Sequence, residues 1–433
     1  MRAGQHNPLI CRLLVPPLCL GALVLAGSCG LTESRVALLW TDRPEIALYA
    51  SYFNSSQDEY TVEVRYLESP SGELSAQLSS QLSALTSSAQ RPDIVAASWL
   101  KSASIMSLFS PMDGMMQQGN IAAEAFYPRL LAQGRLEEKQ YLLPVSFNLP
   151  ALIFARDQGE LLSSAFIISL EEIQELGGAY NRETRGAWSQ MGFSPVWDQE
   201  FLYIIAALFD SAFREASPLA WDAPAIEEAV SYTRDWISAI NKSVEAGDDF
   251  VFKYFYEPVE KLTISGRILF SYKQSADFFT LTEEERGSLG FRWIAGPGTI
   301  PISEGITYLG ICKYGQAPGA AAAFVQWFFQ EDTQRQFLES GKQYRINENT
   351  FGIAGGFSAL KTVTERIFPQ YYPGLLGHMP PEEYLSPPAI LPGNWTVLKE
   401  RIVLPYLYER IHDGAETASL DRRLAEWIRL NRD

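Results

Sequence analysis

Residues 36–66 read VALLWTDRPEIALYASYFNSSQDEYTVEVRY, and this stretch contains the pattern that determines the fold. The continuous apolar run at 36–40 predicts a buried strand, and the alternating, Val- and Tyr-rich run at 60–66 predicts a second one. The segment 44–53 between them starts with proline and predicts a helix. Strand, helix and strand in this order indicate a parallel sheet with right-handed crossovers.

The alternation continues along the chain. Leucines at helical spacing predict an amphipathic helix at 71–88, and DIVAA at 93–97 predicts a third strand. Further strands are expected at 141–144, 151–154, 263–272, 290–294 and 306–312. Further helices are expected at 122–136, 170–176, 199–213, 225–240 and 318–338. The pattern predicts an α/β protein with more than one sheet.

Composition excludes several classes of function. The 433 residues are 47% hydrophobic, which is ample for a core, and the formal net charge of −16 disfavours a nucleic-acid-binding surface. Only three histidines occur, and no clustered Cys/His pattern predicts a metal site. Residues 352–356 (GIAGG) do not match a dinucleotide fingerprint, and no P-loop is present, so we expect no cofactor.

The N-terminal segment has the layout of an export signal. Residues 1–28 combine two arginines, a short apolar run and a final Ala-Gly-Ser, and Cys29 follows. This layout resembles a bacterial lipoprotein signal, in which the cysteine becomes the lipidated N-terminus. We therefore expect a signal peptide at 1–28 and a short tether at 29–35. The protein would be lipid-anchored at the bacterial cell membrane, on its periplasmic or extracellular face. Cleavage after Ser28 by an ordinary signal peptidase remains the alternative.

Five stretches in order resemble the extracellular solute-binding proteins of bacterial carbohydrate ABC importers, the maltose-binding-like type. They are VALLWTDRPE (36–45), RPDIVAASW (91–99), YLLPVSFNLPALIFARD (141–157), ISGRILFSY (264–272) and GITYLGICKYGQAPGAAAAFVQWFFQEDTQRQF (305–337). The resemblance implies two α/β lobes, each a mainly parallel sheet flanked by helices, with a ligand cleft between them. It also implies a small-molecule ligand, a sugar, and delivery to a membrane permease; we expect a monomer.

The resemblance also sets the expected domain boundaries. Lobe one would combine 31–147 with 301–342, and lobe two would combine 149–298 with 350–433. The hinge crossings would lie near 145–150, 296–303 and 340–355. Lobe closure over the ligand would present the closed form to the permease.

Candidate ligand-binding residues follow the predicted strands, because ligands of open α/β sheets bind beyond the carboxyl ends of strands. Aromatic faces suit the C–H faces of a sugar, and carboxylates and amides suit its hydroxyl groups. Asn148 also falls where members of the family carry an acidic or amide ligand residue. The strand-end candidates are Trp40, Thr41, Asp42, Ser98, Trp99, Ser146, Phe147 and Asn148. Candidates from the rest of the chain are Trp197, Tyr272, Asp277, Glu304 and Trp395.

Alternative interpretations stay open at this point. Trp40 and Trp99 could be ordinary core residues, and Asp42 could cap the following helix. A glycoside hydrolase needs two facing carboxylates, which no pair of successive strand ends supplies here, so we expect no enzyme activity. The same fold could also bind a non-sugar solute or act as a ligand sensor.

Overall fold

The computed structural model describes residues 34–67, 91–217, 219–345, 349–412 and 417–431. The expected signal peptide, Cys29 and the expected helix at 71–88 lie outside these residues.

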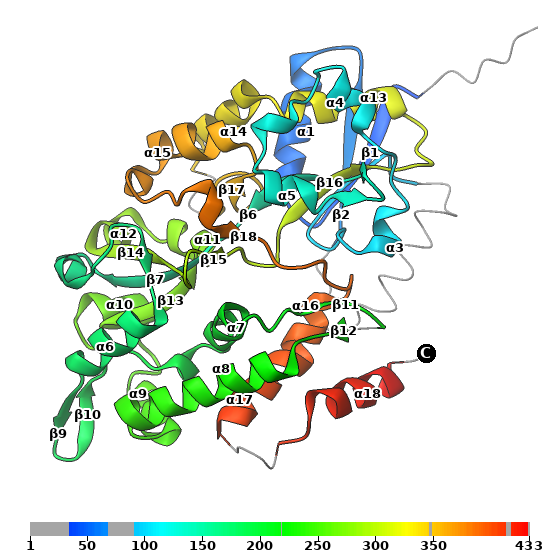
Figure 1. The fold of residues 1–433 in the computed structure, drawn as a ribbon. Helices are drawn as coiled ribbons and strands as arrows, with labels where there is room; N and C mark the ends of the chain where they lie inside the picture. Colours follow the sequence, from blue (N-terminus) through cyan, green and yellow to red (C-terminus); the bar gives the residue numbers. More distant parts are fainter. Residues whose placement is uncertain (1–33, 68–90, 218, 346–348, 413–416, 432–433) are drawn as a thin grey trace, which may run out of the picture. The chain divides into compact units, whose positions relative to one another are not determined.

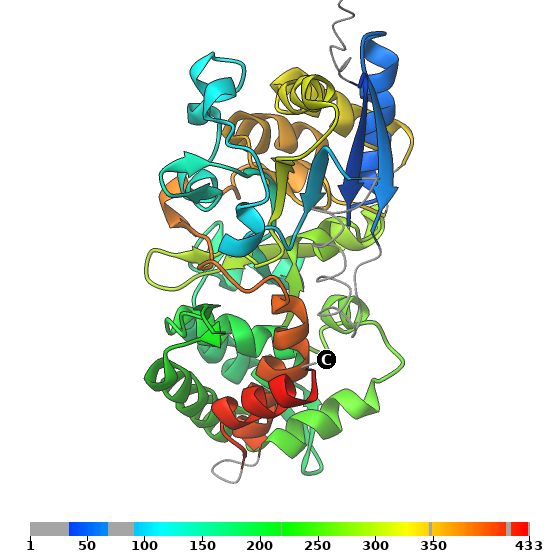
Figure 2. The same ribbon diagram turned by 90° about the vertical axis from the view of Figure 1, so that its right-hand side faces the viewer.

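Two main sheets organise the described chain (Figures 1 and 2). The first, in the order β17-β6-β16-β3-β1-β2, consists of β1 (Val36–Thr41), β2 (Thr61–Tyr66), β3 (Ile94–Ala97), β6 (Leu143–Phe147), β16 (Thr307–Ile311) and β17 (Phe357–Ser358). The second, in the order β13-β7-β14-β8, consists of β7 (Pro150–Ala155), β8 (Ile167–Ile168), β13 (Phe270–Gln274) and β14 (Leu289–Ile294).

Both sheets are mixed, so the expectation of mainly parallel sheets is wrong: three of the five pairings in the first sheet and two of the three in the second are antiparallel. In the first sheet β1 pairs in parallel with β2 and β3, and β16 pairs antiparallel with β3 and β6, so that β6 runs in the direction of β3. In the second sheet β7 runs against β13 and β14, and β8 is parallel to β14. The antiparallel pairs involve strands beside the segments that lead from one sheet to the other, since β7 follows directly from β6 and β16 follows the return of the chain from the second sheet.

Helices flank both sheets (Figure 1). The first group is α1 (Glu45–Ser56), α3 (Ala103–Met106), α4 (Asp113–Gln117), α5 (Pro128–Ala132), α13 (Pro318–Phe328), α14 (Glu331–Gln343) and α15 (Phe368–Tyr371). The second group is α6 (Leu170–Tyr180), α7 (Gln199–Leu208), α8 (Ala223–Trp236), α9 (Val244–Lys253), α10 (Val259–Ile264), α11 (Ser275–Phe279), α12 (Glu283–Ser288), α16 (Trp395–Leu398), α17 (Leu404–His412) and α18 (Leu420–Leu430). Short two-stranded pairs are β4 (Arg135–Leu136) with β5 (Lys139–Gln140), β9 (Arg182–Thr184) with β10 (Ala187–Gln190), β11 (Arg214–Glu215) with β12 (Leu219–Ala220), and β15 (Ile300–Pro301) with β18 (Leu385–Ser386).

Several expected elements differ in the structure, and one is the helix expected at 318–338, which consists of α13 and α14 with the extended residue Gln330 between them. The helix expected at 122–136 is reduced to a single 3-10 turn at Ala123–Ala125 and to α5, because Tyr127 has an extended backbone and the ring of Pro128 does not fit into the interior of a helix. The strand expected at 263–272 begins at Phe270, since α10 occupies the first part and Gly266 turns the chain with a φ of +68°.

The third hinge crossing also differs from the expected position near 340–355. After α14 the chain stays with the first sheet, where β17 pairs with β6 and the Phe357 ring lies 5.7 Å from that of Phe147. Leu375 still belongs to the core of the first sheet, whereas Leu391 belongs to the core around α7 and α8. The passage therefore lies between these two leucines, and the part of 350–433 before it packs with the first sheet. The bend at 352–356 is a turn before β17.

Strand β7 joins the two cores. Ala151 and Ile153 face the core shared with the first sheet, whereas Leu152 and Phe154 face the core around α7 and α17. Side chains of a strand alternate between its faces, and both faces of β7 are covered. This explains why PALIFA is a continuous apolar run.

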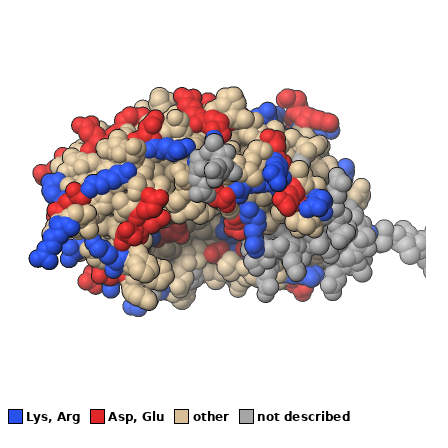
Figure 3. Space-filling view, turned by 90° about the horizontal axis from the view of Figure 1, so that it is seen from below, with Lys and Arg blue, Asp and Glu red and all other residues tan. Residues whose placement is uncertain are grey.

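Surface charge is mixed on the face seen from below. Lys and Arg side chains lie among Asp and Glu side chains in the coloured part of that face (Figure 3). The acidic excess of the chain is not gathered there into one patch.

Replacing Ile153 tests the role of β7. Ile153 is fully buried, and we expect Ile153→Ala to lower the free energy of unfolding by about 2–5 kcal/mol because it leaves a cavity. Ile264→Ala, at a position where 39% of the side chain is exposed, is the matched control and should cost under about 1 kcal/mol. Urea unfolding followed by circular dichroism measures both. Equal losses in the two variants would contradict the placement of β7.

Candidate functional site

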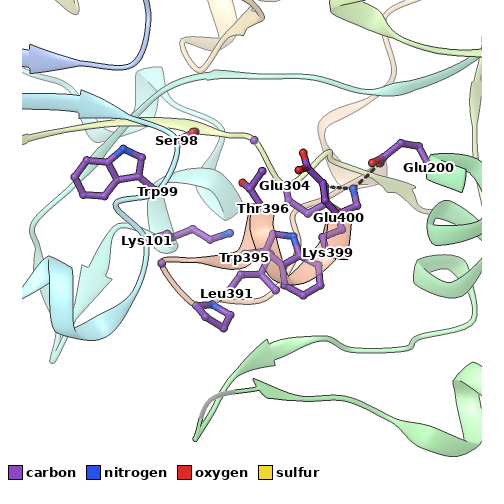
Figure 4. A pocket seen from close by; sticks show the side chains of 13 residues that line it. Ser98, Trp99, Lys101, Glu200, Glu304, Leu391, Trp395, Thr396, Lys399 and Glu400 are labelled. Carbon is purple, nitrogen blue, oxygen red and sulfur yellow. Dashed lines mark hydrogen bonds and ion pairs between the residues drawn. The ribbon is translucent and has the colours of Figure 1, made fainter. Parts of the chain in front are cut away.

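A pocket of about 140 Å³ lies between the C-terminal end of β3 and the segment around α16 (Figure 4). Residues from the parts of the chain that surround each of the two main sheets form its walls. From the side of β3 and β16 come Ser98, Trp99, Lys101 and Glu304, and from the side of α7 and α16 come Glu200, Trp395, Lys399 and Glu400. The pocket thus brings together four of the predicted residues: Ser98, Trp99, Glu304 and Trp395.

Asp42 positions the turn that carries Ser98. One carboxylate oxygen of Asp42, Oδ2, accepts hydrogen bonds from the backbone N–H of Ser98 at 3.1 Å and from its hydroxyl at 2.8 Å. The two residues meet because β1 and β3 are parallel neighbours whose carboxyl ends share one edge. Helix α1 has no side-chain cap, so Asp42 does not cap it. Asp42 itself does not line the pocket.

The two aromatic residues of the pocket come from opposite walls. Trp99 is half-buried and packs against Val397 in α16. Trp395 is 6% exposed, and its ring lies 5.9 Å from Tyr203 and 5.5 Å from Phe213. The indole N–H of Trp395 is buried and has no hydrogen-bond partner among the described residues. A buried donor of this kind ordinarily finds a partner.

An ion triad forms the floor of the pocket. The ammonium group of Lys399 contacts the carboxylates of Glu200 and Glu304, the latter at 3.0 Å, and lies 4.2 Å from the centre of the Tyr203 ring. Burial alone would lower the pKa of Lys399, but the carboxylates of Glu304 and Glu200 outweigh burial and raise it. Burial raises the pKa of Glu200, and Lys399 limits the rise. The triad joins the segment after α16 to α7 and to the loop before β16.

Lys101 is a second buried lysine in the wall, 6% exposed. Its ammonium group donates to Gln133 Oε1 at 2.9 Å and to the carbonyl oxygen of Pro388 at 3.4 Å. Burial lowers the pKa of Lys101 to about 7, and the carboxylate of Glu304 opposes this change only in part. No carboxylate of the described residues lies within ion-pair distance of it.

Five of the predicted residues serve packing or turns in the structure. Trp40 is 2% exposed in the first core, with the Arg65 guanidinium 5.1 Å from its ring. Phe147 is likewise a core residue, and Trp197 stacks on Phe250 at 5.8 Å. The other two are Thr41, whose hydroxyl accepts from the Arg43 N–H, and Ser146, whose hydroxyl donates to the Ala354 carbonyl.

Asn148 lies where the chain leaves β6 for β7, and its amide is used within the protein. Its Nδ2 donates to the carbonyl oxygen of Gly355 at 2.9 Å, and its Oδ1 accepts from the hydroxyl of Ser275 at 2.7 Å. Its backbone carbonyl accepts from the N–H of Ser303 at 3.0 Å. Asn148 therefore connects three segments that are far apart in sequence, and it does not line the pocket.

Tyr272 and Asp277 lie outside the pocket lining. Tyr272 is 8% exposed, and its hydroxyl has no hydrogen-bond partner among the described residues. Burial raises its pKa, and nearby carboxylates, first that of Glu200, add to the rise. Tyr272 is thus a neighbour of the ion triad. Asp277 lies in the first turn of α11.

Sequence reasoning missed four charged residues of the pocket: Lys101, Glu200, Lys399 and Glu400. Two of them follow a predicted tryptophan closely, since Lys101 is two residues after Trp99 and Lys399 is one helical turn after Trp395. This spacing was a usable signal. Glu200 carried no comparable signal, because only the fold brings the start of α7 to the pocket.

Two further features of the described part of the chain concern metal ions and membranes. No group of three or more His, Cys, Asp or Glu side chains there could hold a metal ion. Among the same residues, no helix has both the length and the apolar character needed to cross a bilayer.

The burial of Lys101 predicts a pH dependence of stability. The unfolded chain binds the Lys101 proton up to a pKa near 10.5, whereas the folded chain releases it near 7, so this group favours folding more as the pH rises from 7 towards 10.5. We expect Lys101→Met to be about 2 kcal/mol more stable than wild type at pH 6. The gain should shrink by pH 9.5. Urea unfolding across pH 6–9.5 measures it, with the exposed Lys139→Met as control; a gain that is constant with pH would contradict the assignment.

The chain is similar to known proteins in its sequence pattern and in its fold. The family model described as "Bacterial extracellular solute-binding protein" matches residues 49–348, more than half of the chain. The sequence matches none of the curated proteins compared with it.

Three similar solved structures illustrate the fold. The sugar-binding protein MalE from Xanthomonas citri has a TM-score of 0.62 at 13% identity, covering 92% of this chain and 96% of that one. The cyclic α-maltosyl-1,6-maltose binding protein from Arthrobacter globiformis has a TM-score of 0.59 at 16% identity, covering 90% and 96%. An ABC substrate-binding protein from Listeria monocytogenes in complex with cycloalternan has a TM-score of 0.58 at 12% identity, covering 92% and 97%. The fold is thus that of two-lobe binding proteins, and the chain belongs to the bacterial extracellular solute-binding protein family.

Proposed function

We propose that this protein captures a carbohydrate outside the cytoplasm and delivers it to the permease of an ABC importer. The observation that carries the proposal is the pocket in which Trp99 and Trp395, from opposite walls, lie beside the carboxylates of Glu200 and Glu304. Aromatic faces and hydrogen-bonding rims are the two features that sugar recognition needs. The similar structures support the sugar class, since the three named above are described as a sugar-binding protein, a cyclic α-maltosyl-1,6-maltose binding protein and a protein in complex with cycloalternan.

Pocket size and charge agree with a neutral sugar unit. A volume of 140 Å³ corresponds to roughly five water molecules, which is the scale of one sugar ring. Lys399 compensates one of the two carboxylate charges beside it, so the triad offers oriented acceptors and donors at a formal net charge of −1. A neutral polyhydroxyl ligand can bond to such groups without disrupting the pairs.

Lobe closure is part of the proposal. We assign lobe one to 31–147 and 301–342, extended by 349–375, and lobe two to 149–298 with the remainder after the third passage. The two walls already touch, because Trp99 packs on Val397 and the N–H of Ala103 donates to Glu215 Oε2 at 3.0 Å. A ligand that bridges both walls would favour the closed population.

Replacing Trp99 tests the pocket. In a thermal-shift screen of mono- and oligosaccharides, a bound sugar should raise the melting temperature in a dose-dependent way. Trp99→Ala should then weaken binding of that sugar about tenfold or more, because a large apolar contact face is lost. Trp188→Ala, a half-buried tryptophan of β10 outside the pocket, is the matched control. Unchanged affinity in Trp99→Ala would place the sugar elsewhere, and a shift only with amino acids or polyamines would reject the sugar class.

We also propose that Cys29 carries a lipid that holds the protein at the membrane. The layout of residues 1–28 supports this proposal. One acylated cysteine bearing several chains would anchor firmly, because each buried methylene adds to membrane affinity.

Replacing Cys29 tests the anchor. Cells grown with radiolabelled palmitate should label the wild-type protein, and Cys29→Ser should lose the label and leave the membrane fraction. Cys312→Ser serves as the control, since this cysteine is buried and should not acquire label. An unlabelled wild-type protein in the soluble fraction would favour ordinary secretion.

A further inference from the structure

A second, larger pocket of about 650 Å³ lies away from the sugar site. It is bordered by β14, α12 and α14 and by the segment that follows α15, which lie near one another in Figure 1. Its volume is within the range of small-molecule sites, roughly 300–1,000 Å³. The two pockets share no lining residue.

Cations dominate the charged lining of this pocket. Arg156, Arg286, Arg292 and Lys342 face a single lining carboxylate, that of Glu283, in a chain whose formal net charge is −16. None of the four cations lies within ion-pair distance of a carboxylate of the described residues. Four cations gathered without carboxylate partners repel one another, and a bound anion would relieve that repulsion.

Two of the guanidinium groups are held in place by the backbone. Arg156 donates to the carbonyl oxygens of Gly287 at 2.7 Å and Arg286 at 2.9 Å. Arg292 donates to Ser164 O at 2.6 Å and to Phe291 O at 2.8 Å. A guanidinium carries five N–H donors, so each keeps donors that these bonds do not use. The buried Nε of Arg286 has no hydrogen-bond partner among the described residues.

Aromatic rings supply the apolar part of the same lining. They are Phe154, Phe278, Phe279, Phe291, Tyr371 and Tyr372. The Phe279 and Phe291 rings are 5.5 Å apart, and the Arg292 guanidinium lies 5.1 Å from the centre of Phe154. Fixed cations beside flat apolar faces match a ligand that carries a negative group on a flat apolar body.

We propose that this pocket binds a small aromatic anion, such as a phosphate ester or carboxylate on a ring. The cations bind the anionic group through charge-assisted hydrogen bonds, and the rings stack on the flat body. The proposal does not depend on sugar binding, because it uses different residues.

Phenyl phosphate is a suitable probe, with inorganic phosphate and benzyl alcohol as probes for the anion and the ring alone. Isothermal titration calorimetry in 0.15 M NaCl should show saturable binding of phenyl phosphate, at least about tenfold tighter than either partial probe. The double variant Arg286→Gln/Lys342→Gln should weaken it at least about tenfold. The double variant Arg422→Gln/Arg429→Gln, at two exposed arginines of α18, removes the same number of charges and should leave the affinity unchanged.

Two further measurements keep the outcomes distinct. Thermal unfolding shows whether each variant is folded, and Trp99→Ala should bind phenyl phosphate like wild type, because Trp99 lines only the other pocket. Absence of saturable binding, equal affinity for inorganic phosphate, or unchanged affinity in the folded double variant would each overturn the proposal. Loss of sugar binding in Trp99→Ala with phenyl phosphate binding retained would support both sites independently.

Discussion

The passage of the chain from β6 to β7 is the constraint on which the rest of the structure depends. Backbone groups at this point lie between two sheets and must be paired within the protein. Asn148 provides the pairing, with bonds to Gly355 and Ser303 and, through its side-chain oxygen, to Ser275. Ser275 in turn exchanges two hydrogen bonds with Leu149. Segments on both sides of the passage are thereby fixed to one point, from which β6 and β7 enter their sheets in a set register. An amide at Asn148 is needed for this geometry whether or not a ligand also reaches it, since donor and acceptor are used at once.

Much of the architecture could be predicted from the sequence because its signals are local. The strand at 36–40, the strand at 60–66 and the parallel pairing between them follow from an apolar run, an alternating run and a helix of the right length. The third passage could not be found in this way. The glycine-rich stretch 352–356 resembles a hinge crossing, but it only turns the chain before β17. The chain stays with the first sheet because phenylalanines such as Phe357 pack against Phe147. Contacts between residues that are distant in sequence produce no periodic sequence pattern from which they could be predicted.

The candidate site was predictable to a similar degree. The rule that ligands bind beyond strand ends identified Ser98 and Trp99, because β3 ends at the pocket. The same rule selected Trp40, which belongs to β1 itself and points into the core, and here the alternation of side chains along a strand was the more decisive principle. Glu200 and Lys399 are almost two hundred residues apart, and the contact between their side chains exists only in the folded chain. Charge pairing over such a separation cannot be read from composition.

The two pockets differ in how their charges are compensated, and this difference bears on what each can bind. In the first pocket Lys399 is paired with Glu200 and Glu304, so an ionic solute would have to compete with existing partners and lose part of its own hydration. A neutral solute meets no such penalty. In the second pocket the cations of Arg286 and Lys342 have no carboxylate partner within ion-pair distance among the described residues, and an anion would add the missing partner. Burial raises the free energy of an uncompensated charge in both pockets. Lys101 shows the consequence where no carboxylate lies within ion-pair distance: burial lowers its pKa to about 7, and the side chain becomes a neutral donor and acceptor as the pH rises above that value.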